Sequence, residues 1–211
     1  IKITKGLDLK LYGEPTPEVV ETFVSEYALK PKDFIGLTPK LLIEEGERVK
    51  AGTPLFYAKG KEKVLFTSPV SGVVKQVKRG EKRVIEEVIV SADETIEYLD
   101  FGVSSISELN AEQIKEKMLI SGAWTLLRQR PYSVVPNPDT TPKCIIVSGF
   151  SSAPLAPDYS ILLKGLGAEL QVGIDALKKM TGVTIHVNVP AGQGRAEELA
   201  NKDEYREKFD Y

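Results

Sequence analysis

The amino-acid sequence predicts a multidomain α+β protein, with a β-rich domain over residues 1–105 and an α/β domain over residues 106–211. The chain has 211 residues, 42% of them hydrophobic, which is enough for two domains with separate cores. Short apolar stretches separated by glycines fill the first half, whereas a strand–helix–strand pattern fills the second. The polar stretch Asp93–Ser107 separates these two patterns and is interpreted as the boundary.

The N-terminal residues predict short extended elements at an edge of the β-rich domain. Between Ile3 and Tyr12, leucines alternate with charged residues, which is the period of a half-buried strand. Beyond Pro15 and Pro17, the run Glu18–Val24 has hydrophobic residues on both faces. We interpret it as a short extended run and leave a helix open.

Residues from about 40 to 90 predict a compact β module. The stretch Leu41–Tyr57 is interpreted as three strands joined by turns at Gly46 and Gly52, because glycine readily adopts the positive φ of such turns. The sequence Gly46-Glu47-Arg48-Val49 is echoed by Gly80-Glu81-Lys82-Arg83-Val84 beyond a polar tip. Two similar half-motifs flanking a hairpin are typical of a sandwich with internal two-fold symmetry. The module is therefore predicted to be a barrel-sandwich hybrid of the lipoyl or biotinyl kind.

Lys61 lies where the modified lysine of a lipoyl carrier would stand, before Pro69. The acidic residue and alanine that flank a lipoyl lysine are absent from the segment Ala58-Lys59-Gly60-Lys61-Glu62-Lys63. The paired methionines that flank a biotinyl lysine are absent as well. A solvated charged turn is therefore favoured over covalent modification, and a lipoyl or biotin-type carrier is the less favoured alternative function.

A helix is expected to open the second half of the chain. Asn110, with Gln113 three residues later, is typical of a helix cap. The helix is predicted to run from about Ala111 into Ser121, and Gly122 limits it.

A strand–helix–strand unit follows. The apolar run Cys144–Ser148 is typical of a strand covered on both faces, and a helical pattern runs through Leu170–Met180. The run Val183–Val189 returns as a strand, so a Rossmann-like parallel sheet is expected. The charged end from Glu197 to Tyr211 fits a final helix. Because two parallel strands make an incomplete sheet, the chain is interpreted as part of a longer protein.

Composition excludes several classes of function. Lysine and arginine number 28 against 30 aspartates and glutamates, so nucleic acid is not an expected partner. Cys144 and His186 are the only cysteine and histidine, whereas zinc and iron–sulfur sites need several such ligands. No metal site is expected. No apolar run approaches the length of a membrane span, so we expect a soluble chain that meets a membrane only through its partners in a complex.

Two glycine-containing segments are weak candidates for phosphate contact. Gly165-Leu166-Gly167 lacks a third glycine and does not directly follow a strand, so a turn that opens the long helix is favoured. Gly192-Gln193-Gly194-Arg195 does follow a predicted strand, but a plain loop is still favoured there.

The candidate binding residues lie in one segment: Trp124, Arg128, Arg130 and Tyr132. An aromatic platform beside guanidinium groups could face a planar quinone or flavin ring, or a partner protein. Ordinary core packing of Trp124 with exposed arginines is the competing and favoured interpretation. No catalytic residue is assigned.

Several segments together resemble the A subunit of the sodium-translocating NADH:quinone oxidoreductase. These segments are Lys5–Asp8, Ile35–Leu42, Val49–Tyr57, Phe66–Gly72 and Ser121–Arg128. They are spread over most of the first 130 residues, which makes the resemblance specific. Because proteins of that family are longer than this chain, the resemblance implies an N-terminal part.

The resemblance implies a peripheral subunit on the cytoplasmic face of the bacterial inner membrane. It belongs to an electron-transport translocase that oxidises NADH, reduces ubiquinone or menaquinone and exports sodium. The partners implied are the other subunits, on which NADH, FAD or FMN and a 2Fe-2S centre are expected. No covalently bound cofactor is expected on this chain, whose implied role is quinone association or assembly.

The chain is also similar to the flavoprotein subunit of respiratory complex I. That similarity makes a flavin- or NADH-binding α/β protein the alternative. The corresponding helix start reads Ser121-Gly122-Ala123-Trp124, and its bulky tryptophan and lost glycines argue against flavin or NADH on this chain.

Overall fold

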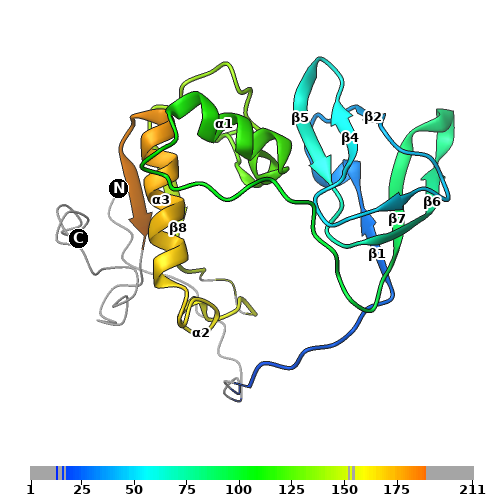
Figure 1. The fold of residues 1–211 in the computed structure, drawn as a ribbon, viewed down its shortest axis with the longest axis horizontal. Coiled ribbons are helices and arrows are strands. Elements are labelled where there is room, and N and C mark those ends of the chain that lie inside the picture. The colour runs from blue at the N-terminus through cyan, green and yellow to red at the C-terminus, as the bar shows by residue number, and fades with distance from the viewer. Residues whose placement is uncertain (1–12, 14–15, 17, 152, 154, 189–211) are drawn as a thin grey trace, which may run out of the picture. The chain divides into compact units, whose positions relative to one another are not determined.

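The computed structural model describes residues 13, 16, 18–151, 153 and 155–188 (Figure 1). The described residues fall into two compact units. The β unit consists of Thr22–Thr141 with Lys179–Thr181, and the α/β unit contains Pro142–Lys178 together with the strand that follows Gly182. The strand predicted between Ile3 and Tyr12 lies outside the described residues.

Two antiparallel sheets form the β unit. One has the order β1-β7-β6-β3, made of Glu26–Leu29, Ile85–Ala92, Gly72–Arg79 and Arg48–Val49. The other has the order β2-β4-β5, made of Pro39–Leu41, Pro54–Ala58 and Lys61–Thr67. Short 3-10 helices lie at η1 (Pro31–Asp33) and η2 (Glu81–Arg83). The predicted module of residues 40–90 is thus confirmed as a β sandwich.

Alternating burial along the strands builds the core of this unit. In β7, Val88 and Val90 are fully buried while Ile89 between them is only partly buried, as expected for a strand with one face inside. Phe56 and Phe66 are the largest fully buried side chains, contributed by β4 and β5. The hydrophobic cluster continues through Leu119 and Trp124, which follow the sheets in sequence.

The two copies of the predicted repeat form different turns. Only in the first copy do the glycines have positive φ. Gly46 has φ +86° and Gly52 has φ +98°, as the turn prediction requires. Gly80 instead has φ −92°. In the second copy the left-handed backbone falls on Lys82 and Arg83, with φ of 53° and 60°. The extra residue in the second copy therefore moves the turn away from its glycine.

Residues Glu18–Val24 have no regular secondary structure. The helix that the sequence left open there does not form, and the expectation of an extended run stays a prediction. Among the described residues, the strands begin with β1 at Glu26.

The helix cap at Asn110 is confirmed. Helix α1 spans Ala111–Ile120, and the Asn110 side chain accepts from the Gln113 backbone N–H at 2.9 Å while the Gln113 side chain accepts from the Asn110 N–H at 2.9 Å. Gly122 has φ +78° and precedes the 3-10 helix η3 (Ala123–Leu126). A Cβ on Gly122 would lie 2.4 Å from the Thr67 hydroxyl oxygen, so this turn approaches β5 more closely than other residues allow.

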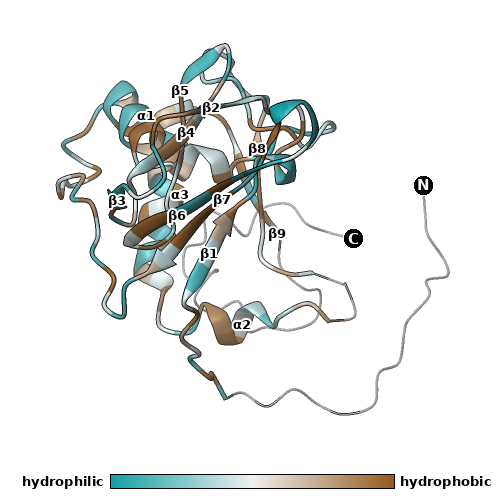
Figure 2. Ribbon diagram, turned by 90° about the vertical axis from the view of Figure 1, so that its right-hand side faces the viewer, coloured by the Kyte–Doolittle hydropathy of each residue, from teal (hydrophilic) through white to brown (hydrophobic). Residues whose placement is uncertain are grey.

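The α/β unit contains the predicted strand–helix–strand arrangement. Its elements are β8 (Ile145–Ser148), α2 (Tyr159–Leu162), α3 (Gly167–Thr181) and β9 (Ile185–Asn188). Strands β8 and β9 pair in parallel, with Ile146 opposite His186. In Figure 1, β9 is the orange arrow that follows α3 in the chain, and Figure 2 shows much of the short helix α2 in brown, the hydrophobic end of the scale.

The prediction that β8 is covered on both faces is wrong for the described residues. Ile146 is 63% exposed, and burial alternates along the strand. Beyond Asn188, the predicted loop Gly192–Arg195 and the predicted final helix lie outside the described residues.

Candidate functional site

Three phenylalanine rings form a cluster, two of them from the β2-β4-β5 sheet. Phe56 and Phe66 lie opposite each other in the β4–β5 pairing, and their rings stack with centroids 5.0 Å apart. Phe34, which follows η1, meets Phe66 edge-on with centroids 4.7 Å apart. Offset stacking and edge contacts are the preferred geometries of aromatic pairs, so the cluster is a well-packed platform.

A pocket of about 170 Å³ opens beside this platform, entirely within the β unit. Its walls are mostly aliphatic and aromatic. The lining residues are Phe34, Ile35, Gly36, Leu37, Thr38, Ala58, Lys59, Lys61, Val64, Phe66, Val134 and Val135. The pocket thus brings together the segment after η1, the β4–β5 hairpin and a loop more than 60 residues further along the chain.

Two lysines supply the charge of the pocket. Lys59 is exposed, whereas Lys61 is half-buried and its Nζ donates to the Val135 carbonyl oxygen at 3.4 Å. That distance lies beyond the usual range for such bonds, so the bond is weak. The Lys61 side chain nevertheless lies against the β unit, because it is half-buried and contacts Val135. This does not favour the carrier alternative, since the modified lysine of a carrier must be free to move.

Arg128 lies over the Phe34 ring, with its guanidinium carbon 5.1 Å from the ring centroid. This is a cation–π contact. Its guanidinium also donates to the carbonyl oxygens of Thr125 and Leu127. Of the four predicted binding residues, Arg128 is thus the one that touches a pocket-lining ring.

Trp124 supports the pocket from behind. Its side chain is 5% exposed, and its indole N–H donates to the Pro136 carbonyl oxygen at 3.0 Å. Pro136 directly follows Val135, a pocket-lining residue. Trp124 is therefore packed in the core, as the favoured interpretation expected, and holds the pocket wall in place.

Arg130 and Tyr132 lie on the surface. Both are exposed, Tyr132 by 72%. They belong to a loop that is closed by a bridge between Gln129 and Val134, with an N–H···O distance of 2.7 Å. The structure thus separates the predicted set into a core residue, a ring-contacting arginine and two surface residues. Their contacts with a quinone or a partner stay predictions.

Sequence reasoning missed the pocket itself. Phe34, Val64 and Phe66 carry no polar chemistry and were not singled out as site residues. Three signals were available in the sequence. The segments Ile35–Leu42 and Phe66–Gly72 belong to the family resemblance, and Lys61 stands at the position of a carrier lysine. Ile35–Thr38, Phe66 and Lys61 all line the pocket.

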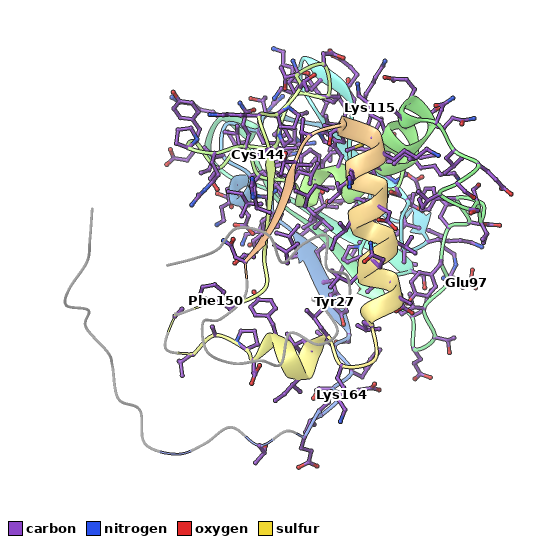
Figure 3. All side chains as sticks on the ribbon, turned by 90° about the vertical axis from the view of Figure 1, so that its left-hand side faces the viewer. Tyr27, Glu97, Lys115, Cys144, Phe150 and Lys164 are labelled. Atoms are coloured by element: carbon purple, nitrogen blue, oxygen red, sulfur yellow. The ribbon has the colours of Figure 1, made fainter. Side chains whose placement is uncertain are left out.

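The α/β unit presents the remaining candidates separately. Cys144 immediately precedes β8 and is partly exposed, and Figure 3 shows Cys144 and Phe150 at opposite ends of that strand. His186 lies on β9. Gly165 has φ +81° and forms the expected turn shortly before α3.

Neither a metal-binding cluster nor a membrane-spanning helix is found in the part of the chain that the structure describes. Within these residues, no group of three or more metal-binding side chains occurs. Over the same ranges, none of the helices has the length and apolar character needed to cross a bilayer.

Comparison with known proteins finds a family match in each half of the chain. Residues 1–93 match the family model described as the NqrA N-terminal barrel-sandwich hybrid domain. Residues 109–208 match the model described as the NqrA second alpha/beta domain.

Curated relatives, each named as the A component of a Na(+)-translocating NADH-quinone reductase, are similar over most of the chain. The protein from Serratia proteamaculans (strain 568) is 37% identical over 197 residues, which is 91% of this chain and 44% of the relative. The protein from Yersinia pseudotuberculosis serotype O:1b (strain IP 31758) is 36% identical over 196 residues, or 92% and 44%. The protein from Neisseria gonorrhoeae (strain NCCP11945) is 35% identical over 195 residues, or 91% and 44%.

Fold and sequence matches together define a barrel-sandwich hybrid domain that is followed in sequence by an α/β domain. The chain spans less than half the length of the relatives that it matches. It belongs to the NqrA family.

Proposed function

We propose that this chain is the N-terminal part of a peripheral subunit in a sodium pump that couples NADH oxidation and quinone reduction to sodium export. The support is membership in the NqrA family and the names of its relatives. Its partners are the other subunits of that complex. NADH, flavin and the 2Fe-2S centre reside on those subunits, and this chain lies on the cytoplasmic face of the bacterial inner membrane.

We further propose that the pocket beside Phe34 and Phe66 receives the quinone head group. The observation that carries this is the combination of apolar walls, stacked rings and a half-buried ammonium group in one pocket. At about 170 Å³ it is smaller than the roughly 300–1,000 Å³ of typical cofactor pockets. It therefore suits a single substituted ring better than a dinucleotide.

The predicted binding residues take different roles in this proposal. Arg128 fixes one face of the Phe34 ring, and Trp124 supports the wall at Pro136. Arg130 and Tyr132 are exposed and serve partner contacts, since arginine and tyrosine are enriched at the centres of protein interfaces. The two expected domains, residues 1–105 and 106–211, both contribute to the pocket, because it joins Phe34 and Phe66 of the first with Val134 and Val135 of the second.

Photo-crosslinking in the intact complex tests the quinone assignment. A photoreactive short-chain quinone, applied to native membranes, is expected to label peptides that contain Ile35–Thr38 or Val134–Val135. An excess of unlabelled quinone should abolish this labelling. Labelling confined to other subunits, with none on this chain, would remove the quinone part of the proposal and leave an assembly role.

A matched pair of variants sharpens the same test. Arg128→Ala removes the cation over Phe34 and should reduce labelling several-fold. Arg79→Ala removes an exposed arginine of β6, which does not line the pocket, and should leave the labelling unchanged.

Titration calorimetry addresses the nucleotide alternative. The purified chain is expected to give no binding heat with NADH or with FMN. Tight binding of either would favour a nucleotide site in the α/β unit.

A further inference from the structure

Lys61 lies in the pocket because the β4–β5 pairing is irregular. Tyr57 pairs with Leu65, but the next residue, Ala58, pairs with Lys61, so the register shifts between them. Along β5, Val64 and Phe66 point inward as alternate residues, and continued alternation would direct Glu62 inward. The shift directs Lys61 there instead, since it lines the pocket with Val64 and Phe66. Such irregularities commonly re-aim a side chain beside a binding site.

The ammonium group of Lys61 makes fewer hydrogen bonds to the described residues than it has N–H donors. An ammonium group has three N–H donors. Among the described residues, its hydrogen-bond acceptor is the Val135 carbonyl oxygen at 3.4 Å, and no ion pair engages it. Lys61 is half-buried next to apolar walls, where a hydrogen bond to a ligand is stronger than in water. A ligand oxygen in the pocket could therefore accept a hydrogen bond from the charged ammonium group of Lys61.

We propose that Lys61 binds a carbonyl oxygen of the quinone head group, so that the position of a carrier lysine becomes a ligand-binding position. This inference rests on the proposed quinone function and adds the residue that recognises the ring. The stacked phenylalanines supply the apolar contact, which any flat ring would satisfy. Lys61 supplies discrimination, because its charge favours a ring with an oxygen acceptor over one without.

Single-tryptophan fluorescence provides the measurement. Trp124 is the only tryptophan, and it is hydrogen-bonded to the residue after Val135, so a ring bound in the pocket should quench it. The purified full chain is titrated with a short-chain ubiquinone analogue. N-acetyltryptophanamide in parallel cuvettes corrects for absorption by the quinone.

Three variants separate recognition from packing. Lys61→Met keeps the apolar stem and removes the donor, and it should weaken quinone binding about tenfold or more, the scale of a lost hydrogen bond to a charged group. Lys61→Arg keeps a charged donor and should retain most of the affinity. Lys63→Met removes an exposed lysine from the same strand that does not line the pocket, and it should bind like the wild type.

A second ligand excludes a merely structural effect. An analogue of the same ring without its carbonyl oxygens should bind wild type and Lys61→Met with equal, weak affinity. If Lys61 only pinned the Val135 loop, Lys61→Met would weaken both ligands alike. Thermal unfolding of each variant checks that the fold is intact.

The possible results separate the role of Lys61 from the proposed quinone-binding function of the pocket. Loss of quinone binding in Lys61→Met alone, for the carbonyl-bearing ring alone, supports the inference. Equal quinone affinity in wild type and Lys61→Met, or equal weakening of both ligands, overturns it and leaves the quinone pocket standing. No quenching of the wild type by quinone overturns the pocket assignment, and the role of Lys61 falls with it.

Discussion

The two hairpins of the β unit, β4–β5 and β6–β7, have similar pairing but different surroundings. The first turns at Gly60 and lies against the loop at Val134–Val135, where the pocket forms. The second ends in a charged turn whose residues are exposed, including Val84 at 59%. In the described part of this chain, the pocket thus forms beside the hairpin against which a later segment packs, and not beside the other.

The two turns also differ in which residues adopt the left-handed backbone conformation. Gly60 provides the left-handed conformation of the first hairpin, whereas Lys82 and Arg83 provide it in the second. Left-handed backbone is unfavourable for residues with a Cβ. Lys82 and Arg83 therefore carry a local backbone cost that Gly60 does not.

The largest expected difference between the hairpins is in core packing. Phe66→Ala removes a fully buried ring that contacts Phe34 and Phe56, and it should lower the free energy of unfolding by about 3–5 kcal/mol. Val84→Ala in the second hairpin should change it by less than about 0.5 kcal/mol. Urea unfolding followed by Trp124 fluorescence measures both. Similar losses for the two variants would break the comparison.

The next effect concerns the turn that joins α1 to η3 beside β5. Gly122→Ala should lower the free energy of unfolding by about 1–2 kcal/mol for its left-handed backbone alone, and further because the new Cβ meets the Thr67 hydroxyl. The double variant Thr67→Ala/Gly122→Ala lacks this contact with the hydroxyl. Its loss of unfolding free energy should therefore be smaller than the sum of the two single losses. Additive losses would mean that Gly122 does not press on β5.

Exchanging the turn residues gives smaller effects of opposite sign. Gly60→Ala should destabilise the chain by about 1 kcal/mol, because φ +81° disfavours alanine although no atom obstructs its Cβ. Lys82→Gly should be neutral or stabilising by up to about 1 kcal/mol, because glycine accepts φ 53°. Thermal melts of both variants measure the shifts. A destabilising Lys82→Gly would show that the lysine side chain matters in that turn.

The smallest effect belongs to the ion pairs beside the second hairpin. The Glu87 carboxylate lies 3.6 Å from both Lys30 and Lys78. Glu87→Gln should lower the free energy of unfolding by about 0–1 kcal/mol, and the loss should shrink in high salt. Melts at two ionic strengths provide the check, and a salt-independent loss would assign the effect to packing.

Local patterns predicted much of the fold. The helix at Ala111 was predictable because its cap depends only on residues three apart in sequence. The turns at Gly46 and Gly52 were predictable because positive φ requires little beyond glycine itself. The exposure of β8 was not predictable in this way, since the burial of a strand depends on what packs against it and not on its own residues.

The pocket was less predictable because it joins segments that are distant in sequence. Nothing local to Lys61 indicates that Val135 will lie beside it. The register shift that turns Lys61 inward arises from the pairing of two strands, not from residue types at one position. Arg128 was found because arginine near aromatic residues is a recognisable pattern, whereas its ring partner, Phe34, lies far earlier in the chain.

Hydrogen–deuterium exchange with and without a short-chain quinone tests the central claim most directly, because it reports on both hairpins in one experiment. When quinone is present, peptides covering Ile35–Thr38 and Lys61–Phe66 should exchange more slowly, and peptides covering Arg79–Val84 should exchange at an unchanged rate. Equal slowing at both hairpins, or slowing at Arg79–Val84 alone, would contradict the claim.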